Sequence, residues 1–139
     1  SQKFPAGTQV ELNQADSLTL QKVPGIGPVF SRRIIKYRDL LGGFYAVHQL
    51  AEVYGIDAEK YAALEPWFTV DTALIRPLAV NQADYRTLIR HPYLNKQQTK
   101  ILLRLIERKG KLQDWEELRL LDEFPPGEIE RLRYYLSFD

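Results

Sequence analysis

The sequence predicts a mainly α-helical fold built from two similar units, with short strands at the ends of each unit. Apolar residues recur at helical spacing, and glycines and prolines separate the helical stretches. The segment Asn13-Gln14-Ala15-Asp16 returns as Asn81-Gln82-Ala83-Asp84, a shift of 68 positions (81 − 13). A repeat at a fixed period indicates a duplicated structural unit.

The repeat divides the chain. The same shift pairs Leu20 with Leu88 and Gly42 with Gly110 without a gap. The 139 residues, 45% of them hydrophobic, suffice for two small domains. We therefore expect an N-terminal extension over 1–9, a first unit over 10–71, a linker over 72–77 and a second unit over 78–139.

Four helices are expected in the first unit. Asp16 is a typical N-cap residue for a short helix that ends near Val23, and Asp57 is another for the fourth helix. Proline at the first helical position and Gly-Gly after the last one favour a longer helix over 28–41. A third helix is expected over 46–53, and residues 67–70 alternate like a strand that pairs with 10–12. The repeat predicts the same order in the second unit.

A glycine-framed hairpin, Pro24-Gly25-Ile26-Gly27-Pro28, joins the first two helices. Glycine tolerates positive φ and leaves no side chain between the backbone and an approaching group. Backbone N–H groups that lead into a helix N-terminus form a site for a phosphate oxygen. This geometry favours nucleic acid as the ligand.

The hairpin and its flanks resemble the helix-hairpin-helix signature. Leu20 and 23–28, preceded by 12–16 and followed by Gly-Gly-Phe at 42–44, are similar to the bacterial competence DNA-uptake receptor (ComEA-like) family. The resemblance implies two tandem helix-hairpin-helix units of the SAM-like orthogonal helical type. It also implies double-stranded DNA binding through phosphates, without base reading. The resemblance further implies a protein tethered outside the cytoplasmic membrane by an N-terminal anchor; the alternative is a cytoplasmic protein.

Three of the four expected hairpins depart from the signature. In the second, Asp57 stands where a glycine would be, and its charge repels phosphate. The main hairpin of the second unit, 91–95, has lost both glycines, and Asn95 is expected to adopt the left-handed conformation. The last hairpin, 121–126, is acidic and ends in two prolines without N–H groups.

The predicted DNA site is therefore local to the first hairpin. A net charge of only +1 excludes general coating of DNA by charge alone. The backbone N–H groups of Gly25, Gly27, Val29 and Phe30 are expected to hold phosphate oxygens, and nearby cations to attract DNA. The DNA-binding residues are Lys22, Gly25, Ile26, Gly27, Val29, Phe30, Arg32, Arg33 and Lys36. The alternative is a helical repeat scaffold for protein–protein interaction, with a protein partner on the second unit.

Catalytic and metal chemistry are not expected. His48 and His91 have no cysteine or carboxylate partners at ligand spacing, and the chain contains no cysteine. No catalytic triad, P-loop or dinucleotide-binding motif is present. We predict a non-enzymatic protein with no cofactor, no metal and no small-molecule substrate.

Overall fold

The computed structural model describes residues 2–139, which are mainly helical, as the sequence predicts. They divide into two compact units. Unit 1 comprises the described residues through Asp39 and Gly43–Ile75; unit 2 comprises Leu40–Gly42 and Arg76–Asp139. The segment predicted as a linker, 72–77, begins with a 3-10 helix, η3 (Thr72–Leu74), and the boundary between the units follows Ile75.

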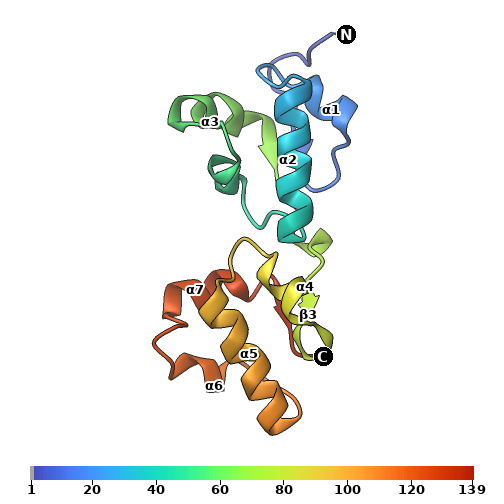
Figure 1. Cartoon of the computed structure of the whole chain (residues 1–139). Helices are drawn as coiled ribbons and strands as arrows, with labels where there is room; N and C mark the ends of the chain where they lie inside the picture. The colour runs from blue at the N-terminus through green and yellow to red at the C-terminus, as the bar shows by residue number, and fades with distance from the viewer. Residues whose placement is uncertain (1) are drawn as a thin grey trace. The chain divides into compact units, whose positions relative to one another are not determined.

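Unit 1 contains the helices expected from its apolar spacing (Figure 1). The predicted third helix is a 3-10 helix, and the predicted strand pair forms. The elements in chain order are β1 (Val10–Glu11), α1 (Ser17–Gln21), α2 (Pro28–Leu41), η1 (Val47–Glu52), α3 (Ala58–Leu64), η2 (Glu65–Trp67) and β2 (Phe68–Thr69).

Unit 2 repeats this order. Its elements are β3 (Leu78–Ala79), η4 (Val80–Gln82), α4 (Tyr85–Ile89), α5 (Lys96–Lys109), α6 (Glu116–Arg119), α7 (Pro126–Leu132) and β4 (Leu136–Ser137). Helices α4, α5 and α7 each lie 68 positions after α1, α2 and α3, respectively.

Strand register repeats at the same period as the sequence. In unit 1 the parallel strands pair Val10 with Phe68, and in unit 2 they pair Leu78 with Leu136. Both residues of the second pair lie 68 positions after those of the first. The first and last strands of each unit therefore close that unit in the same way.

A side-chain clamp holds each unit and explains why asparagine recurs in the repeat. In unit 1, the Asn13 side-chain amide donates to the Phe44 carbonyl over 2.9 Å and accepts from the Phe44 N–H over 2.7 Å. In unit 2, Asn81 makes the same two bonds with Leu112, over 2.9 and 2.8 Å. Each asparagine side chain thus satisfies both backbone groups of one loop residue, as a neighbouring strand would.

The short helices begin at aspartate caps, as predicted. The carboxylates of Asp16, Asp57 and Asp84 each accept the backbone N–H three residues later, over 2.8 Å. These backbone hydrogen bonds stabilise the charged form and lower the pKa of Asp16 and of Asp84.

Each unit has its own apolar core. Fully buried side chains of unit 1 include Leu12, Leu20, Ile26, Ile34, Phe44, Leu50 and Leu64; those of unit 2 include Val80, Leu88, Leu102, Leu112, Leu118, Phe124 and Leu132. Within residues 2–139, no helix has the length and apolar character needed to cross a membrane.

Candidate nucleic-acid interface

The side chain of Ile26 anchors the first hairpin of unit 1 in the core. Ile26 is fully buried, and its N–H donates to the Val23 carbonyl over 3.1 Å. Gly25, at φ +93°, turns the chain just before it. Ile26 therefore has no N–H to offer a ligand, and its role in the predicted site is to hold the hairpin in place.

Four backbone donors of this hairpin are open. Helix α2 begins with the Ser31 N–H donating to the Gly27 carbonyl over 3.0 Å. Across residues 2–139, no hydrogen bond uses the N–H groups of Gly25, Gly27, Val29 or Phe30. Together with the partial positive charge of the α2 N-terminus, they form a cluster suited to an anionic oxygen.

The two glycines serve different purposes. Gly25 lies in the left-handed region, where a side chain is strained, so the turn itself requires glycine there. Gly27 is outside that region, and a Cβ added to it meets no heavy atom within 4 Å. The fold therefore does not require glycine at position 27. Its missing side chain leaves open space at the start of α2.

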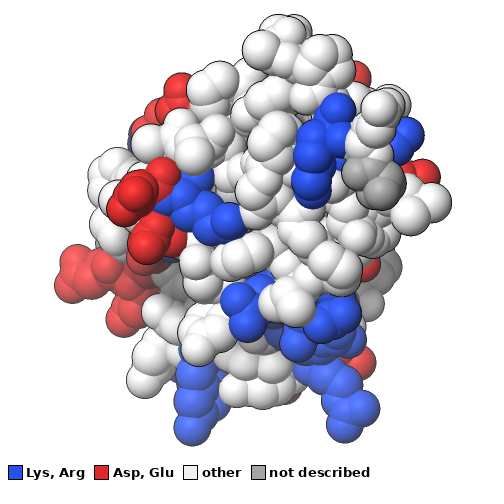
Figure 2. Space-filling view, turned by 90° about the horizontal axis from the view of Figure 1, so that it is seen from above, with Lys and Arg blue, Asp and Glu red and all other residues white. Residues whose placement is uncertain are grey.

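The predicted cations divide into two groups. Lys22, Arg32 and Lys36 are exposed. Arg33 is half-buried: it donates to the Tyr54 carbonyl over 3.3 Å, and its guanidinium carbon lies 4.7 Å from the Tyr54 ring centre. Arg33 thus links α2 to the second hairpin. In Figure 2, which views the molecule from above the orientation of Figure 1, Lys and Arg form separate groups divided by uncharged surface.

Two further cations at the hairpin escaped the sequence analysis. The Lys60 ammonium, from α3, donates to the Gly25 carbonyl over 2.7 Å and lies 4.2 Å from the Phe30 ring centre. Lys3 donates to the carbonyl oxygens of Gln21 and Ile26, the latter over 3.0 Å. Neither lysine is adjacent to the hairpin in sequence. The cap at Asp57 places Lys60 in the first turn of α3, and only the packing of α3 brings it to the hairpin.

The second hairpin of unit 1 supports the first. Gly55, at φ +89°, packs so closely on Arg33 and Phe30 that an added Cβ would lie 2.5 Å from an Arg33 nitrogen. The Asp57 carboxylate accepts a hydrogen bond from the Lys60 N–H at the start of α3. This helix N-terminus is accordingly capped from within, as its aspartate predicts.

The main hairpin of unit 2 has closed the donors that unit 1 leaves open. Tyr93, in the place of Gly25, donates its N–H to His91 Nδ1 over 3.0 Å. Asn95 and Gln98, in the places of Gly27 and Phe30, satisfy each other: the Asn95 N–H donates to Gln98 Oε1 over 3.0 Å, and the Gln98 N–H donates to Asn95 Oδ1 over 2.8 Å. Three of the four donors are therefore used within the unit.

Asn95 does not adopt the left-handed conformation expected for it. Its φ is −98° and its ψ 177°, which is extended backbone, because it serves as the N-cap of α5. The turn survives the loss of both glycines through this capping box and through His91.

The charge at one position beside the hairpin also differs in sign between the units. Where unit 1 has Lys60, unit 2 has Glu128, whose carboxylate accepts a hydrogen bond from the Gln98 side chain. The last hairpin adds exposed Asp122 and Glu123. The basic residues of α5, such as Lys100 and Arg104, are exposed on the same unit. Three of the donors at the unit 2 hairpin are thus unavailable to an anion, and the cation next to it, Arg131, lies 3.8 Å from the Tyr93 ring centre.

No cluster of histidine and carboxylate side chains that could hold a metal occurs within residues 2–139. His91 is buried, and its Nδ1 is occupied by the Tyr93 N–H. The side chains of Asp16 and Asp84 are occupied as helix caps.

Comparison with known proteins agrees with the geometry of unit 1. Residues 5–69 match the family model of the helix-hairpin-helix motif. Over 57 residues, 41% of this chain, it is 35% identical to the endonuclease/exonuclease/phosphatase family domain-containing protein 1 of Danio rerio, and the match spans about a tenth of that protein. Helix-hairpin-helix motifs are generally associated with nucleic-acid binding. The similarity of residues 5–69 is thus to a helix-hairpin-helix motif.

Proposed function

We propose that unit 1 binds double-stranded DNA without sequence preference and without catalysis. The N–H groups of Gly25, Gly27, Val29 and Phe30 hold phosphate oxygens of one strand. Lys22, Arg32, Lys36 and Lys60 add attraction to the backbone, while Arg33 keeps the second hairpin beside the first. Phosphate contacts position a protein on DNA but carry no base information, so no sequence preference is expected.

The contrast between the two units carries this proposal. Both hairpins fold, yet all four donors are open only in unit 1, whose hairpin also has an unshielded glycine at position 27 and a lysine at its edge. A hairpin kept only for packing would gain from the capping box seen at Asn95 and Gln98. We infer that unit 2 is a second, degenerate helix-hairpin-helix unit, as the resemblance to the ComEA-like family suggests.

Binding through one hairpin should be weak. Few phosphates are contacted, so a dissociation constant of about 10⁻⁴ to 10⁻⁶ M at physiological salt and a shallow salt dependence are expected. Stronger attachment requires several copies or a tether.

Gly27→Asn gives the sharpest test, because it copies Asn95 into unit 1. Its side chain should accept the Phe30 N–H and fill the open space, without loss of stability. We expect anisotropy of a labelled duplex to show binding about tenfold weaker or more, in line with the loss of hydrogen bonds to a charged group. Gly127→Asn is the matched control, since an added Cβ there also meets nothing within 4 Å.

Equal binding by the wild type and Gly27→Asn, or no wild-type binding at low salt, would contradict the proposal. Two duplexes of unrelated sequence should bind equally, and a single strand of the same length tests whether the duplex is required. Metal-dependent cleavage of the duplex that Gly27→Asn abolishes would contradict the non-catalytic part.

A second function, protein binding, is favoured for unit 2 by its closed and acidic hairpins. Protein binding by unit 2 would use a surface other than the first hairpin of unit 1.

A further inference from the structure

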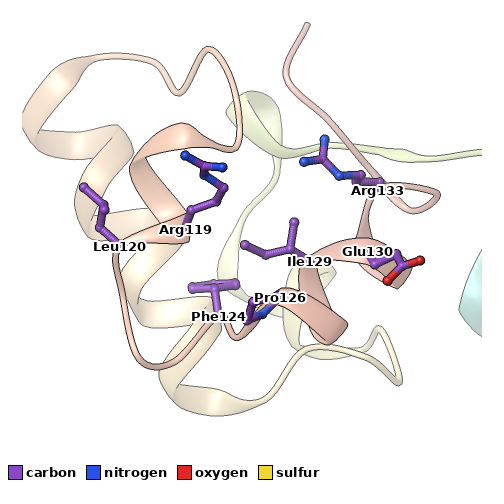
Figure 3. Close-up of a pocket in the computed structure, with 7 residues that line it drawn as sticks. All are labelled: Arg119, Leu120, Phe124, Pro126, Ile129, Glu130 and Arg133. Carbon is purple, nitrogen blue, oxygen red and sulfur yellow. The ribbon is translucent and has the colours of Figure 1, made fainter.

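Unit 2 contains a pocket next to its last hairpin. Its volume is about 330 Å³, near the lower end of the range for ligand pockets. It is formed by α6, the hairpin and α7 (Figure 3). The lining residues are Arg119, Leu120, Phe124, Pro126, Ile129, Glu130 and Arg133.

The pocket has an apolar floor and a cationic rim. Phe124 and Ile129 are buried core residues that form the floor with Pro126. Figure 3 shows Arg119 and Arg133 on opposite sides of Ile129, while the Glu130 carboxylate is directed away from the space between them. Leu120, at the rim, is 85% exposed and extends the apolar surface beyond the pocket.

Unit 1 lacks these features at the same positions. Where unit 2 has Arg119 and Arg133, unit 1 has Ala51 and Glu65, and where unit 2 has Leu120, unit 1 has Glu52. Tyr61 replaces Ile129, and burial, together with the nearby Glu65 carboxylate, raises the pKa of Tyr61. Because the fold accommodates both sets, the arginines and the exposed leucine of unit 2 are not required for folding.

Both arginines can receive a carboxylate. Arg119 has an ion pair with Glu116 over 2.9 Å, but both side chains are more than half exposed, and such pairs are worth little. Arg133 has no ion pair within residues 2–139; its guanidinium carbon lies 5.7 Å from the Trp115 ring centre. An arginine fork binds carboxylates well in a partly desolvated site.

A polypeptide fits this surface better than a nucleic acid. Pro125 and Pro126, on the adjacent hairpin, have no N–H to donate to a phosphate. An apolar floor continued by an exposed leucine is typical of the anchor site for one apolar side chain of a protein partner.

We propose that this pocket binds a peptide segment of a partner protein in which a large apolar side chain stands beside an aspartate or glutamate. The apolar side chain fills the space over Phe124 and Ile129, and the carboxylate pairs with Arg119 and Arg133. This site is independent of the DNA site of unit 1.

The test uses the full chain, ¹⁵N-labelled, and two short peptides in a Gly/Ser background. One carries a central leucine flanked by aspartates, and the other carries asparagines in their place. We expect the acidic peptide to shift the amide signals of Ile129 and Arg133, with affinity at least tenfold above that of the asparagine peptide. Arg119→Ala combined with Arg133→Glu, which copies unit 1, should abolish the difference.

Arg108→Glu, on the exposed face of α5 outside the pocket, is the charge-reversal control and should bind like the wild type. No shift at millimolar peptide, or equal binding of both peptides, would overturn the proposal. So would a loss of DNA binding, rather than of peptide binding, in the arginine variant. Gly27→Asn must leave peptide binding unchanged, so failure of the DNA proposal is distinguishable from failure of this one.

Discussion

The Lys60 ammonium donates to the Gly25 carbonyl oxygen over 2.7 Å and so joins α3 to the first hairpin. It also lies 4.2 Å from the centre of the Phe30 ring. A cation that already holds the rim of the hairpin stands beside any phosphate bound to the open N–H groups. Lys60 is therefore both a structural link and a source of charge at the site.

Replacing Lys60 should separate these roles. For Lys60→Met we expect weaker DNA binding and a plot of log K against log salt concentration that is shallower by about one unit, as for the loss of one phosphate contact. The measurement is duplex anisotropy over a salt series. Lys100→Met, an exposed lysine of α5, is the control. An unchanged slope in Lys60→Met would leave Lys60 with the structural role alone.

The two hairpin glycines should respond differently to alanine. Gly25→Ala places a Cβ at φ +93° and should lower the free energy of unfolding by about 1 kcal/mol or more. Gly27→Ala has open space and no left-handed strain, so stability should be unchanged or slightly raised. Urea unfolding followed by Trp67 fluorescence reports on unit 1. Equal destabilisation by both substitutions would show that Gly27 is also kept for the fold.

The two asparagine clamps should contribute equally to the stability of their units. Asn13→Leu removes both hydrogen bonds to Phe44, and Asn81→Leu removes both to Leu112. Each should destabilise its own unit by about 1–3 kcal/mol, because the loop groups lose their partners. Trp67 fluorescence monitors unit 1 and Trp115 fluorescence monitors unit 2, each in a variant with the other tryptophan changed to phenylalanine. A cost below about 0.5 kcal/mol would mean that water replaces the clamp.

Unit 2 should lose stability in mild acid through His91. Burial lowers the pKa of His91 in the folded state, and the positive charge of Arg131 lowers it further. The unfolded chain takes up the proton at a pH near the usual pKa of about 6.5. Stability should be fully present above that pH and decline as the pH falls towards the folded-state pKa.

Urea midpoints of unit 2 between about pH 7.5 and 5, followed by Trp115 fluorescence, test this. His91→Val, the residue at the same place in unit 1, should have a smaller pH dependence over that range. An equally steep decline in the variant would assign the effect to other groups.

Much of the fold was accessible from the sequence because its signals are local. The cap at Asp16, the proline that begins α2 and the pattern of apolar residues are each encoded within a few positions. The closure of the unit 2 hairpin was not predicted, since it depends on Asn95 and Gln98 satisfying each other rather than on either residue alone. Lys60 was missed for a related reason: it is 35 residues from Gly25 and reaches it only through tertiary packing.

The parallel pairing of the first and last strands has a consequence for how the chain could change. Since β1 joins β2 and β3 joins β4, each unit completes its own backbone pairing and borrows no strand from the other. A duplicated copy of such a unit needs no new partner strand in order to fold. If the two units do descend from one, as we infer, a phosphate-binding hairpin kept in one copy would leave the other free to cap its donors and acquire a different surface.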